Sequence, residues 1–326
     1  MDVSRRDFIK RMTALGLSTA AAWTMFSWLA CAPKKSPAVS PAPALAPLSS
    51  RTPVPTQGGA YLAVARGESP AAMVQAVLKA LGGIESFVKS GDDVIIKPNI
   101  CVAYHTPEYA ATTNPEVVGS LVALCLGAGA RRVRVMDFPF GGTAQQAYSR
   151  SGIEEAVRAA GGQMEVMSSI KFRETAIPDG IDIKEWPVYG DALDANVIIN
   201  VPVAKHHSLA RLTLGMKNLM GLIQDRAQFH FNLGQRVADL ASLLRPRLTI
   251  VDAVRILLNH GPTGGSLDDV KMTNTIIASP DIVAADAYAA TLFGLTGGDI
   301  PAVRAGAQMG LGTMDLKSIK IEEMNV

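Results

Sequence analysis

The chain has 326 residues, with 31 Lys and Arg against 29 Asp and Glu. Residues 1–31 hold four of the basic and two of the acidic residues, which leaves 27 of each sign in the remainder. Because that remainder carries no net charge, the chain lacks the basic surplus of a nucleic-acid-binding protein. Its three cysteines form no Cys-x-x-Cys pair, which excludes an iron–sulfur cluster or a cysteine-rich zinc site held by this chain alone.

The N-terminal segment, residues 1–31, has the features of an export signal. Residues 4–10 read SRRDFIK, close to the twin-arginine pattern, and an uncharged apolar stretch follows over 12–30. At about 1.5 Å per residue that stretch is roughly 28 Å long, nearly enough to cross a bilayer core. Leu29-Ala30-Cys31 resembles the end of a lipobox, so we expect lipidation at Cys31. Ordinary cleavage to a soluble protein and retention as an uncleaved anchor are the alternatives.

These features predict a location as well as a route. The twin-arginine export machinery would carry the folded chain, in many such proteins with a cofactor already loaded. The protein would then work in the periplasm or on the outer face of the cytoplasmic membrane, tethered there by a lipid or an N-terminal anchor. Residues 32–59, with seven prolines, are expected to form a stiff spacer. Residues 60–326 show no further Pro/Gly/Ser-rich break and are expected to form one domain.

Strand-like and helix-like runs alternate in this domain. Strands are expected at 61–65, 94–96, 133–136, 164–167, 197–199, 248–251, 275–278 and 317–321, the last at a sheet edge. Helices are expected at 70–89, 114–129, 144–160, 231–244 and 281–293. The run Val94-Ile95-Ile96 has no polar alternation, as in a parallel strand that is buried on both faces. The alternation predicts an α/β fold with a doubly wound, mostly parallel sheet and helices on both faces.

Polar residues follow several of the predicted strands. In such sheets ligands bind beyond the carboxyl ends of the strands, where these side chains would converge on one crevice. The residues expected to carry chemistry there are Lys97, Asp137, Lys205, His206, Lys217 and Asp252. The residues expected to contact a ligand are Asn99, Asn114, His207, Asn218, Gly264 and Gly265. Lysines, histidines and carboxylates facing one crevice would bind a small anion or hold a metal.

The segment 212–221 is apolar but interrupted by Gly215 and Gly221, with Lys217-Asn218 at its centre. One interpretation is a backbone that approaches a ligand, with Lys217 as the charge partner. The other is a buried helix or loop with a snorkelling lysine. The loop 261–265 resembles a phosphate-cradling turn in composition, but it lacks the spacing of the known nucleotide-binding motifs.

The histidines offer a second kind of site. His206, His230 and His260, together with an aspartate, could supply the ligands of a divalent metal. Adjacent side chains cannot share one face of a strand or a helix, so at most one of His206 and His207 would point into the crevice. A capping or surface position at the start of the predicted helix 231–244 is the ordinary alternative for His230.

Taken in order, these motifs resemble the domain-of-unknown-function 362 family over roughly residues 60–322. The resemblance rests on KPN at 97–99, TNP at 113–115, GAGA at 127–130 before a strand that ends in Asp137, AKHH at 204–207, LT at 212–213, MKNLMG at 216–221, VDA at 251–253, GPTGG at 261–265 and AADA at 284–287. Many members of that family carry a ferredoxin-like iron–sulfur segment after this domain. The present chain ends at Val326 without those cysteines. The resemblance therefore implies an architecture and a set of residues, and it implies no particular reaction.

Three functions are compatible with the sequence. The first is an exported enzyme for a small anionic or carbonyl substrate, in which lysines neutralise charge and a histidine with Asp137 or Asp252 moves protons. The second is a protein that binds a metal or a cofactor. The third is a non-catalytic accessory subunit of a membrane redox complex. We favour the first two functions over the third.

Overall fold

The computed structural model describes residues 61–326, so the predicted twin-arginine signal, the lipobox at Cys31 and the spacer lie outside the described residues. The central feature of the described part is a sheet in the order β12-β1-β11-β10-β7-β2-β3-β4. Its strands are β1 Leu62–Arg66, β2 Asp93–Pro98, β3 Arg132–Val135, β4 Gln163–Met164, β7 Val197–Val201, β10 Leu248–Leu257, β11 Val270–Ser279 and β12 Ile321–Asn325. Neighbours from β10 to β4 are parallel, and β11 is antiparallel to both β1 and β10. The predicted α/β fold with a mostly parallel sheet is confirmed.

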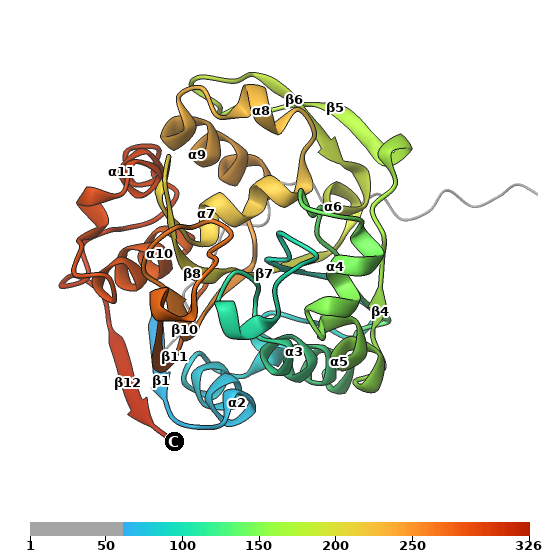
Figure 1. Cartoon of the computed structure of the whole chain (residues 1–326), viewed down its shortest axis with the longest axis vertical. Coiled ribbons are helices and arrows are strands. Elements are labelled where there is room, and N and C mark those ends of the chain that lie inside the picture. The colour runs from blue at the N-terminus through green and yellow to red at the C-terminus, as the bar shows by residue number, and fades with distance from the viewer. Residues whose placement is uncertain (1–60) are drawn as a thin grey trace, which may run out of the picture. The chain divides into compact units, whose positions relative to one another are not determined.

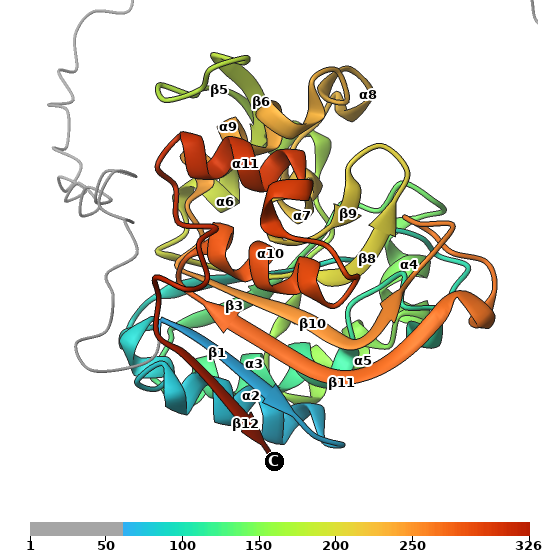
Figure 2. The same ribbon diagram turned by 90° about the vertical axis from the view of Figure 1, so that its left-hand side faces the viewer.

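Helices cover both faces of this sheet (Figures 1 and 2). One group consists of α2 Pro70–Ala80, α3 Pro115–Gly127, α4 Ala144–Arg150 and α5 Ile153–Ala159. The other consists of α6 Gly190–Asp194, α7 Gly215–Asn218, α8 Arg226–Phe229, α9 Leu233–Leu244, α10 Ile282–Thr291 and α11 Pro301–Gln308. Short 3-10 helices occur at η2 Ile84–Ser86, η3 Pro107–Tyr109, η4 Ser169–Lys171, η5 Leu219–Leu222, η6 Leu267–Asp269 and η7 Gly297–Asp299. Among residues 61–326, no helix has the length and apolarity that crossing a membrane requires.

Strand β2 lies between the two layers of helices and presents apolar side chains to both. Val94 and Ile96 belong to the core under α2, α3 and α5, whereas Ile95 belongs to the core under α9, α10 and α11. Successive side chains of a strand point to opposite faces, so a strand between two layers must be apolar at every position. All three side chains are completely buried, as the unbroken apolar run predicts.

Helix boundaries follow local signals. Asn114 caps α3, with its Oδ1 accepting from the N–H of Glu116 at 2.9 Å, and Asp281 caps α10 in the same way. The helix predicted over 144–160 is instead two helices, because Gly152 between them takes a φ of 71°. The predicted helix 70–89 ends at Ala80, where Gly82 and Gly83 turn the chain with positive φ.

The largest difference lies at strand β10, which was predicted to end at 251 and continues to Leu257. After Pro202 the chain resumes as β8 Val203–His207, which pairs in parallel with the later part of β10 and forms a hairpin with β9 Arg211–Thr213. A two-stranded sheet of β5 Phe172–Ala176 and β6 Glu185–Tyr189 was also not predicted. The last strand, β12, lies at the sheet edge as predicted, a few residues later than expected.

Candidate functional site

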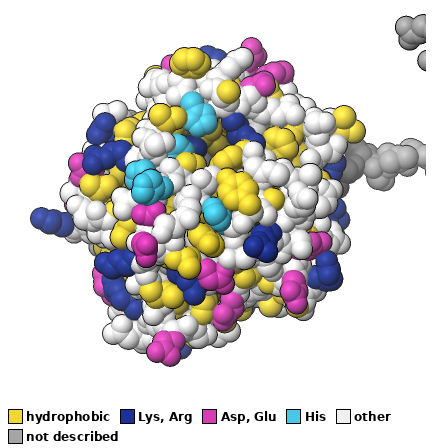
Figure 3. All heavy atoms as spheres, viewed as in Figure 1, with side chains coloured by type: hydrophobic (Ala, Val, Ile, Leu, Met, Phe, Trp, Pro, Cys, Tyr) yellow, Lys and Arg dark blue, Asp and Glu magenta, His cyan; other side chains and the backbone are white. Residues whose placement is uncertain are grey.

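A pocket of about 320 Å³ lies beyond the carboxyl ends of β2 and β3. The loops after these strands, the β8–β9 hairpin and the segment from α7 to α8 form its walls. Its charged and titratable lining residues are Asp137, Lys205, His207, Lys217, Arg226, His230 and Cys101. Its apolar lining comes chiefly from Phe138, Phe140, Leu209, Met220 and Pro262. On the face seen in Figure 3, histidine side chains lie among hydrophobic and basic ones.

Behind this pocket, Lys97 of β2 forms a buried ion pair with Asp137. Its Nζ lies 2.8 Å from Asp137 Oδ1 and also donates to Pro98 O at 2.6 Å. Burial lowers the pKa of Lys97, and the Asp137 carboxylate opposes that shift. The backbone N–H groups of Ile100 and Phe138 donate to the other lone pairs of Asp137. Asp137 is therefore fixed by an ammonium and two amides, which suits a structural and electrostatic role.

Three asparagines connect the strand ends to α7. Asn218 Nδ2 donates to Lys97 O at 3.1 Å and to Asn200 Oδ1 at 2.9 Å. Asn218 Oδ1 accepts from Asn99 Nδ2 at 2.9 Å and from Lys97 Nζ at 3.2 Å. Asn99 Oδ1 in turn accepts from Lys205 Nζ at 2.8 Å. This asparagine network holds Lys97 and Lys205 at fixed positions relative to each other and to α7.

Lys205 of β8 has no carboxylate partner among the described residues. Besides Asn99, its Nζ donates to Ala111 O at 2.6 Å and lies 3.4 Å from Cys101 Sγ. Burial lowers the pKa of Lys205, and the neighbouring Cys101 and Asp137 oppose that effect. The amine is thus held by neutral groups inside a pocket that contains other cations.

Lys217 differs from Lys97 and Lys205, because its Nζ has no hydrogen bond or ion pair with any described residue. Burial, followed by the charges of Lys205, Arg226 and Lys97, lowers the pKa of Lys217 to about 7. Arg226, Lys97, Lys205 and Lys217 together form what we call the cation cluster. Arg226 Nη1 donates to Phe138 O at 2.7 Å, and its guanidinium lies 4.8 Å from the Phe138 ring centroid. Among the described residues that line the pocket, Asp137 is the only carboxylate that could balance these charges.

The pocket also contains two neutral histidines in complementary tautomers. His207 Nδ1 accepts from the N–H groups of Leu209 and Ala210, so the ring proton is on Nε2. Burial and the nearby cations, Lys217 first, lower the pKa of His207 to about 3. His230 Nδ1 lies 2.5 Å from Arg226 O, which can only accept, so His230 carries its proton on Nδ1 and leaves Nε2 as an acceptor. The two rings stack with centroids 6.4 Å apart.

Glycine and a buried carboxylate shape the backbone around Lys217. A Cβ at Gly221 would overlap Asp137 Oδ1 and stand 2.7 Å from Lys97 Nζ, so only glycine permits this close approach. Asp286 of α10 accepts from the N–H of Gly215 at 2.6 Å and from that of Met216 at 2.9 Å. The first turn of α7, which carries Lys217, is therefore anchored to α10 through one side chain.

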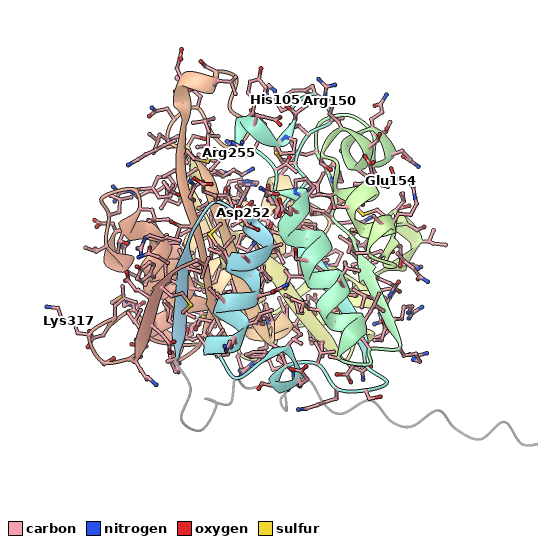
Figure 4. All side chains as sticks on the ribbon, turned by 90° about the horizontal axis from the view of Figure 1, so that it is seen from below. His105, Arg150, Glu154, Asp252, Arg255 and Lys317 are labelled. Carbon is pink, nitrogen blue, oxygen red and sulfur yellow. The ribbon has the colours of Figure 1, made fainter. Side chains whose placement is uncertain are left out.

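Several predicted site residues lie outside this pocket. Asp252 is buried inside β10 and accepts from the N–H of Asn114 at 2.7 Å, in a separate small cavity at the start of α3. Figure 4 shows Asp252 and Arg255 on the side of the sheet that α2 and α3 cover. Burial raises the pKa of Asp252 to about 6. The predicted position of Asp252 at a strand end in the crevice was wrong, because β10 continues beyond it.

Gly264, Gly265 and two of the predicted histidines, His206 and His260, also lie outside the pocket lining. Gly264 takes a φ of 69° beside Leu257, Gly265 has open space around it, and Pro262 is the residue of this loop that lines the pocket. His206 Nδ1 accepts from the N–H of Gly261 at 3.1 Å, and His260 is an exposed side chain 2.7 Å from Asp269.

The predicted metal ligands His206, His230 and His260 therefore do not meet in one place. Within residues 61–326, no group of three or more His, Cys, Asp or Glu side chains comes together in a way that could hold a metal ion. Nor does His207 or His230 hydrogen-bond to a described carboxylate, so the expected pairing of a histidine with Asp137 or Asp252 is absent from this part of the chain.

Comparison with known proteins identifies the family. The model of the family described as "Domain of unknown function (DUF362)" matches residues 94–291, more than half of the chain. The protein belongs to the DUF362 family. The matched range contains every lining residue of the pocket, as well as Lys97 and Asp286.

Two further similarities accompany the DUF362 match. The thylakoid-associated protein sll1697 of Synechocystis sp. is 28% identical over 250 residues, which cover 74% of this chain and 75% of that protein. The structure of the lactate racemase apoprotein from Thermoanaerobacterium thermosaccharolyticum matches with a TM-score of 0.46 and 12% identity. That match covers 69% of this chain and 55% of the other, so the DUF362 chain spans about half the length of the lactate racemase structure.

No site role was predicted from the sequence for Asp286, Arg226 or Cys101. Asp286 could have been found, because it is the one charged side chain in the otherwise apolar helix α10. Arg226 lies in a short helix with no distinctive local pattern, and Cys101 is an isolated cysteine. Only the packing of α8 and of the loop after β2 brings these two side chains to the pocket.

Proposed function

We propose that this DUF362 protein is an enzyme that binds a small anionic substrate in the pocket lined by Lys205, Lys217 and Arg226. The observation that carries the proposal is the imbalance of charge. Three basic side chains line the pocket and Lys97 lies just behind it, whereas Asp137 is the only carboxylate among the described lining residues. A bound anion would supply the partner that Lys217 lacks and would be held by charge-assisted hydrogen bonds.

The rest of the lining defines the substrate further. Phe138, Phe140, Leu209 and Met220 form apolar walls, so the substrate would carry an apolar group beside its charge. His207 would donate a proton from Nε2 in a hydrogen bond, and His230 would accept one at Nε2. A hydrogen-bond donor and an acceptor in one pocket are the groups that general acid–base catalysis requires.

Binding measurements with the full chain test this proposal. Calorimetry with 3-phenylpropionate and with its neutral amide, 3-phenylpropanamide, compares two ligands that differ in charge. We expect the carboxylate to bind at least about tenfold more tightly. We also expect Lys217→Met to weaken that binding by at least about tenfold, because a hydrogen bond to a charged group contributes about 1.5–3 kcal/mol.

The matched control is Lys317→Met, since Lys317 is exposed and projects from the edge of the molecule in Figure 4. This variant should bind like the unaltered protein. If 3-phenylpropionate and other small anions, such as inorganic phosphate, bind no better than the amide, the proposed anion pocket is wrong. Equal losses in the Lys217 and Lys317 variants would contradict it as well.

We also propose that the protein works at a membrane surface after export by the twin-arginine machinery, tethered through Cys31 or the N-terminal segment. Support comes from the signal-like residues 1–31 and from the name of its relative, which describes that protein as thylakoid-associated. Mass spectrometry of the mature N-terminus tests the tether. A lipid on an N-terminal Cys31 or a retained N-terminal segment supports it, and an unmodified, cleaved chain recovered in the soluble fraction contradicts it.

A further inference from the structure

Lys217 is the one amine of the cation cluster that the described structure leaves without a partner. Lys97 Nζ is held by Asp137, Pro98 O and Asn218, and Lys205 Nζ is held by Asn99 and Ala111 O. The Nζ of Lys217 has no such contact, although the side chain lines the pocket. A structural lysine in a partly buried site would be expected to hold a carboxylate or a carbonyl.

The surroundings of Lys217 also favour its neutral form. Burial and the charges of Lys205, Arg226 and Lys97 bring its pKa to about 7, so that much of the amine is unprotonated near neutral pH. An exposed lysine with a pKa of about 10.4 is almost entirely protonated there. A lysine that is desolvated and stands beside other cations is the arrangement that activates an amine as a nucleophile toward carbonyl carbon.

We propose that Lys217 forms a reversible imine with the carbonyl group of an α-oxo acid bound in this pocket. The inference rests on the proposed anion site, since the substrate's carboxylate would be held by Lys205 and Arg226. In an α-oxo acid the carbonyl is bonded directly to the carboxylate carbon, so one cation cluster serves both groups. The apolar walls select an acid with a hydrophobic side group, for which phenylpyruvate is the probe.

The step balances without any further reagent. The neutral Nζ of Lys217 attacks the carbonyl carbon, and a C–N bond forms as the carbonyl oxygen becomes a hydroxyl group. The C–O bond then breaks, and the oxygen leaves as water with the two protons that the amine has lost, which gives the C=N bond. His207, with its proton on Nε2, would donate a hydrogen bond to the oxygen, and His230 Nε2 would accept a proton from the nitrogen.

Borohydride trapping tests the inference on the full chain. Reduction in the presence of phenylpyruvate should convert the imine to a stable amine, seen as one adduct that peptide mass spectrometry locates at Lys217. The trapping rate should rise about tenfold from pH 6 to pH 8 and then level off, as expected for an amine with a pKa of about 7. An excess of 3-phenylpropionate, which has no carbonyl, should prevent the adduct by competition.

Two controls separate this inference from the proposed anion site. Lys217→Arg cannot form an imine and should give no adduct, whereas the unaltered protein should both bind 3-phenylpropionate and give the adduct with phenylpyruvate. Exposed Lys317 in the same sample should stay unlabelled under conditions that modify Lys217. If 3-phenylpropionate binds but no adduct forms at Lys217, the inference is overturned and the anion site stands. Adducts spread evenly over surface lysines also overturn it, and absence of both binding and trapping overturns both proposals.

Discussion

Gly221 offers the sharpest test of how the site is packed, through the substitution Gly221→Ala. The added Cβ would overlap Asp137 Oδ1 and stand 2.5 Å from Lys97 Cε and 2.7 Å from Lys97 Nζ. Neither neighbour has an easy way to yield. Lys97 is completely buried, and Asp137 is fixed by the N–H groups of Ile100 and Phe138. The methyl group must therefore move the η5 segment away or separate the ion pair.

The size of the effect follows from these two possibilities. Forcing an extra methyl group into a packed interior costs about 1–3 kcal/mol. Separating a buried ion pair, so that one charge is left without its partner, costs about 3–5 kcal/mol. We therefore expect Gly221→Ala to lower the free energy of unfolding by about 3 kcal/mol, and to weaken ligand binding because Gly221 lines the pocket.

Urea denaturation of the full chain measures this loss, with Gly127→Ala as the matched control. Gly127 lies in α3 without a positive φ, and no heavy atom lies within 4 Å of the position that an added methyl group would take. Alanine there should be neutral or should stabilise the protein by up to about 1 kcal/mol. If Gly221→Ala changes the free energy of unfolding by less than about 0.5 kcal/mol, the segment 219–222 does not pack against the Lys97–Asp137 pair, and the description of the site is wrong.

Three further predictions concern other groups. Asp239→Asn should lower the free energy of unfolding by about 1–3 kcal/mol in urea denaturation, because Asp239 accepts from the N–H groups of Ile181, Asp182 and Ile183 and an amide cannot satisfy all of them; unchanged stability would contradict this role. Asp286→Ala should weaken 3-phenylpropionate binding in calorimetry, since it frees the N–H groups of Gly215 and Met216 that position Lys217; the exposed Asp315→Ala is the control. Affinity for 3-phenylpropionate should fall as pH rises through about 7, where Lys217 loses its proton. His207, with a pKa of about 3, stays neutral over this range and cannot cause the fall. A pH-independent affinity, or the same fall in Lys217→Met, would refute this assignment.

The sign of the Lys217 contribution to stability can be worked out in the same way. Its pKa is about 7 in the folded protein and about 10.4 in the unfolded chain, so between these values the unfolded chain binds more protons. Stability from this group therefore increases as pH rises from about 7 to about 10. Asp286 acts in the opposite direction at lower pH. Burial raises the pKa of Asp286 to about 7, so between about pH 4 and pH 7 the folded protein retains a proton that the unfolded chain has lost. The stability from this group therefore falls as pH rises from about 4 to about 7.

Local patterns were sufficient to predict the fold class and several residues of the site. The unbroken apolar run of β2 implied a strand between two layers, and the Asn114-Pro115 pair marked the start of α3. The rule that ligands lie beyond the carboxyl ends of parallel strands then brought Lys97, Asp137 and Lys205 together, as the structure does.

The part that could not be predicted depends on long-range pairing. No local pattern predicts that β7 ends just before Pro202 and that the chain then continues as β8, paired with the later part of β10. That continuation extends β10 past Asp252 and leaves its carboxylate to the N–H groups of Asn114 and Val254. It also places His207, and not His206, in the lining of the pocket. Alternation along a strand showed that only one of the two could face the crevice, but the choice between them required the register.

Adjacent residues of α7 explain why the cations of this site differ in role. Asn218 is buried and tied to Lys97, Asn99 and Asn200, so α7 cannot rotate without breaking that network. Successive residues of a helix point about 100° apart, so fixing Asn218 toward the strands directs Lys217 elsewhere, into the pocket. The same network that satisfies Lys97 and Lys205 thereby leaves Lys217 unsatisfied. Lys97 and Lys205 set the positive field of the site, and Lys217 is the group that this field prepares for a ligand.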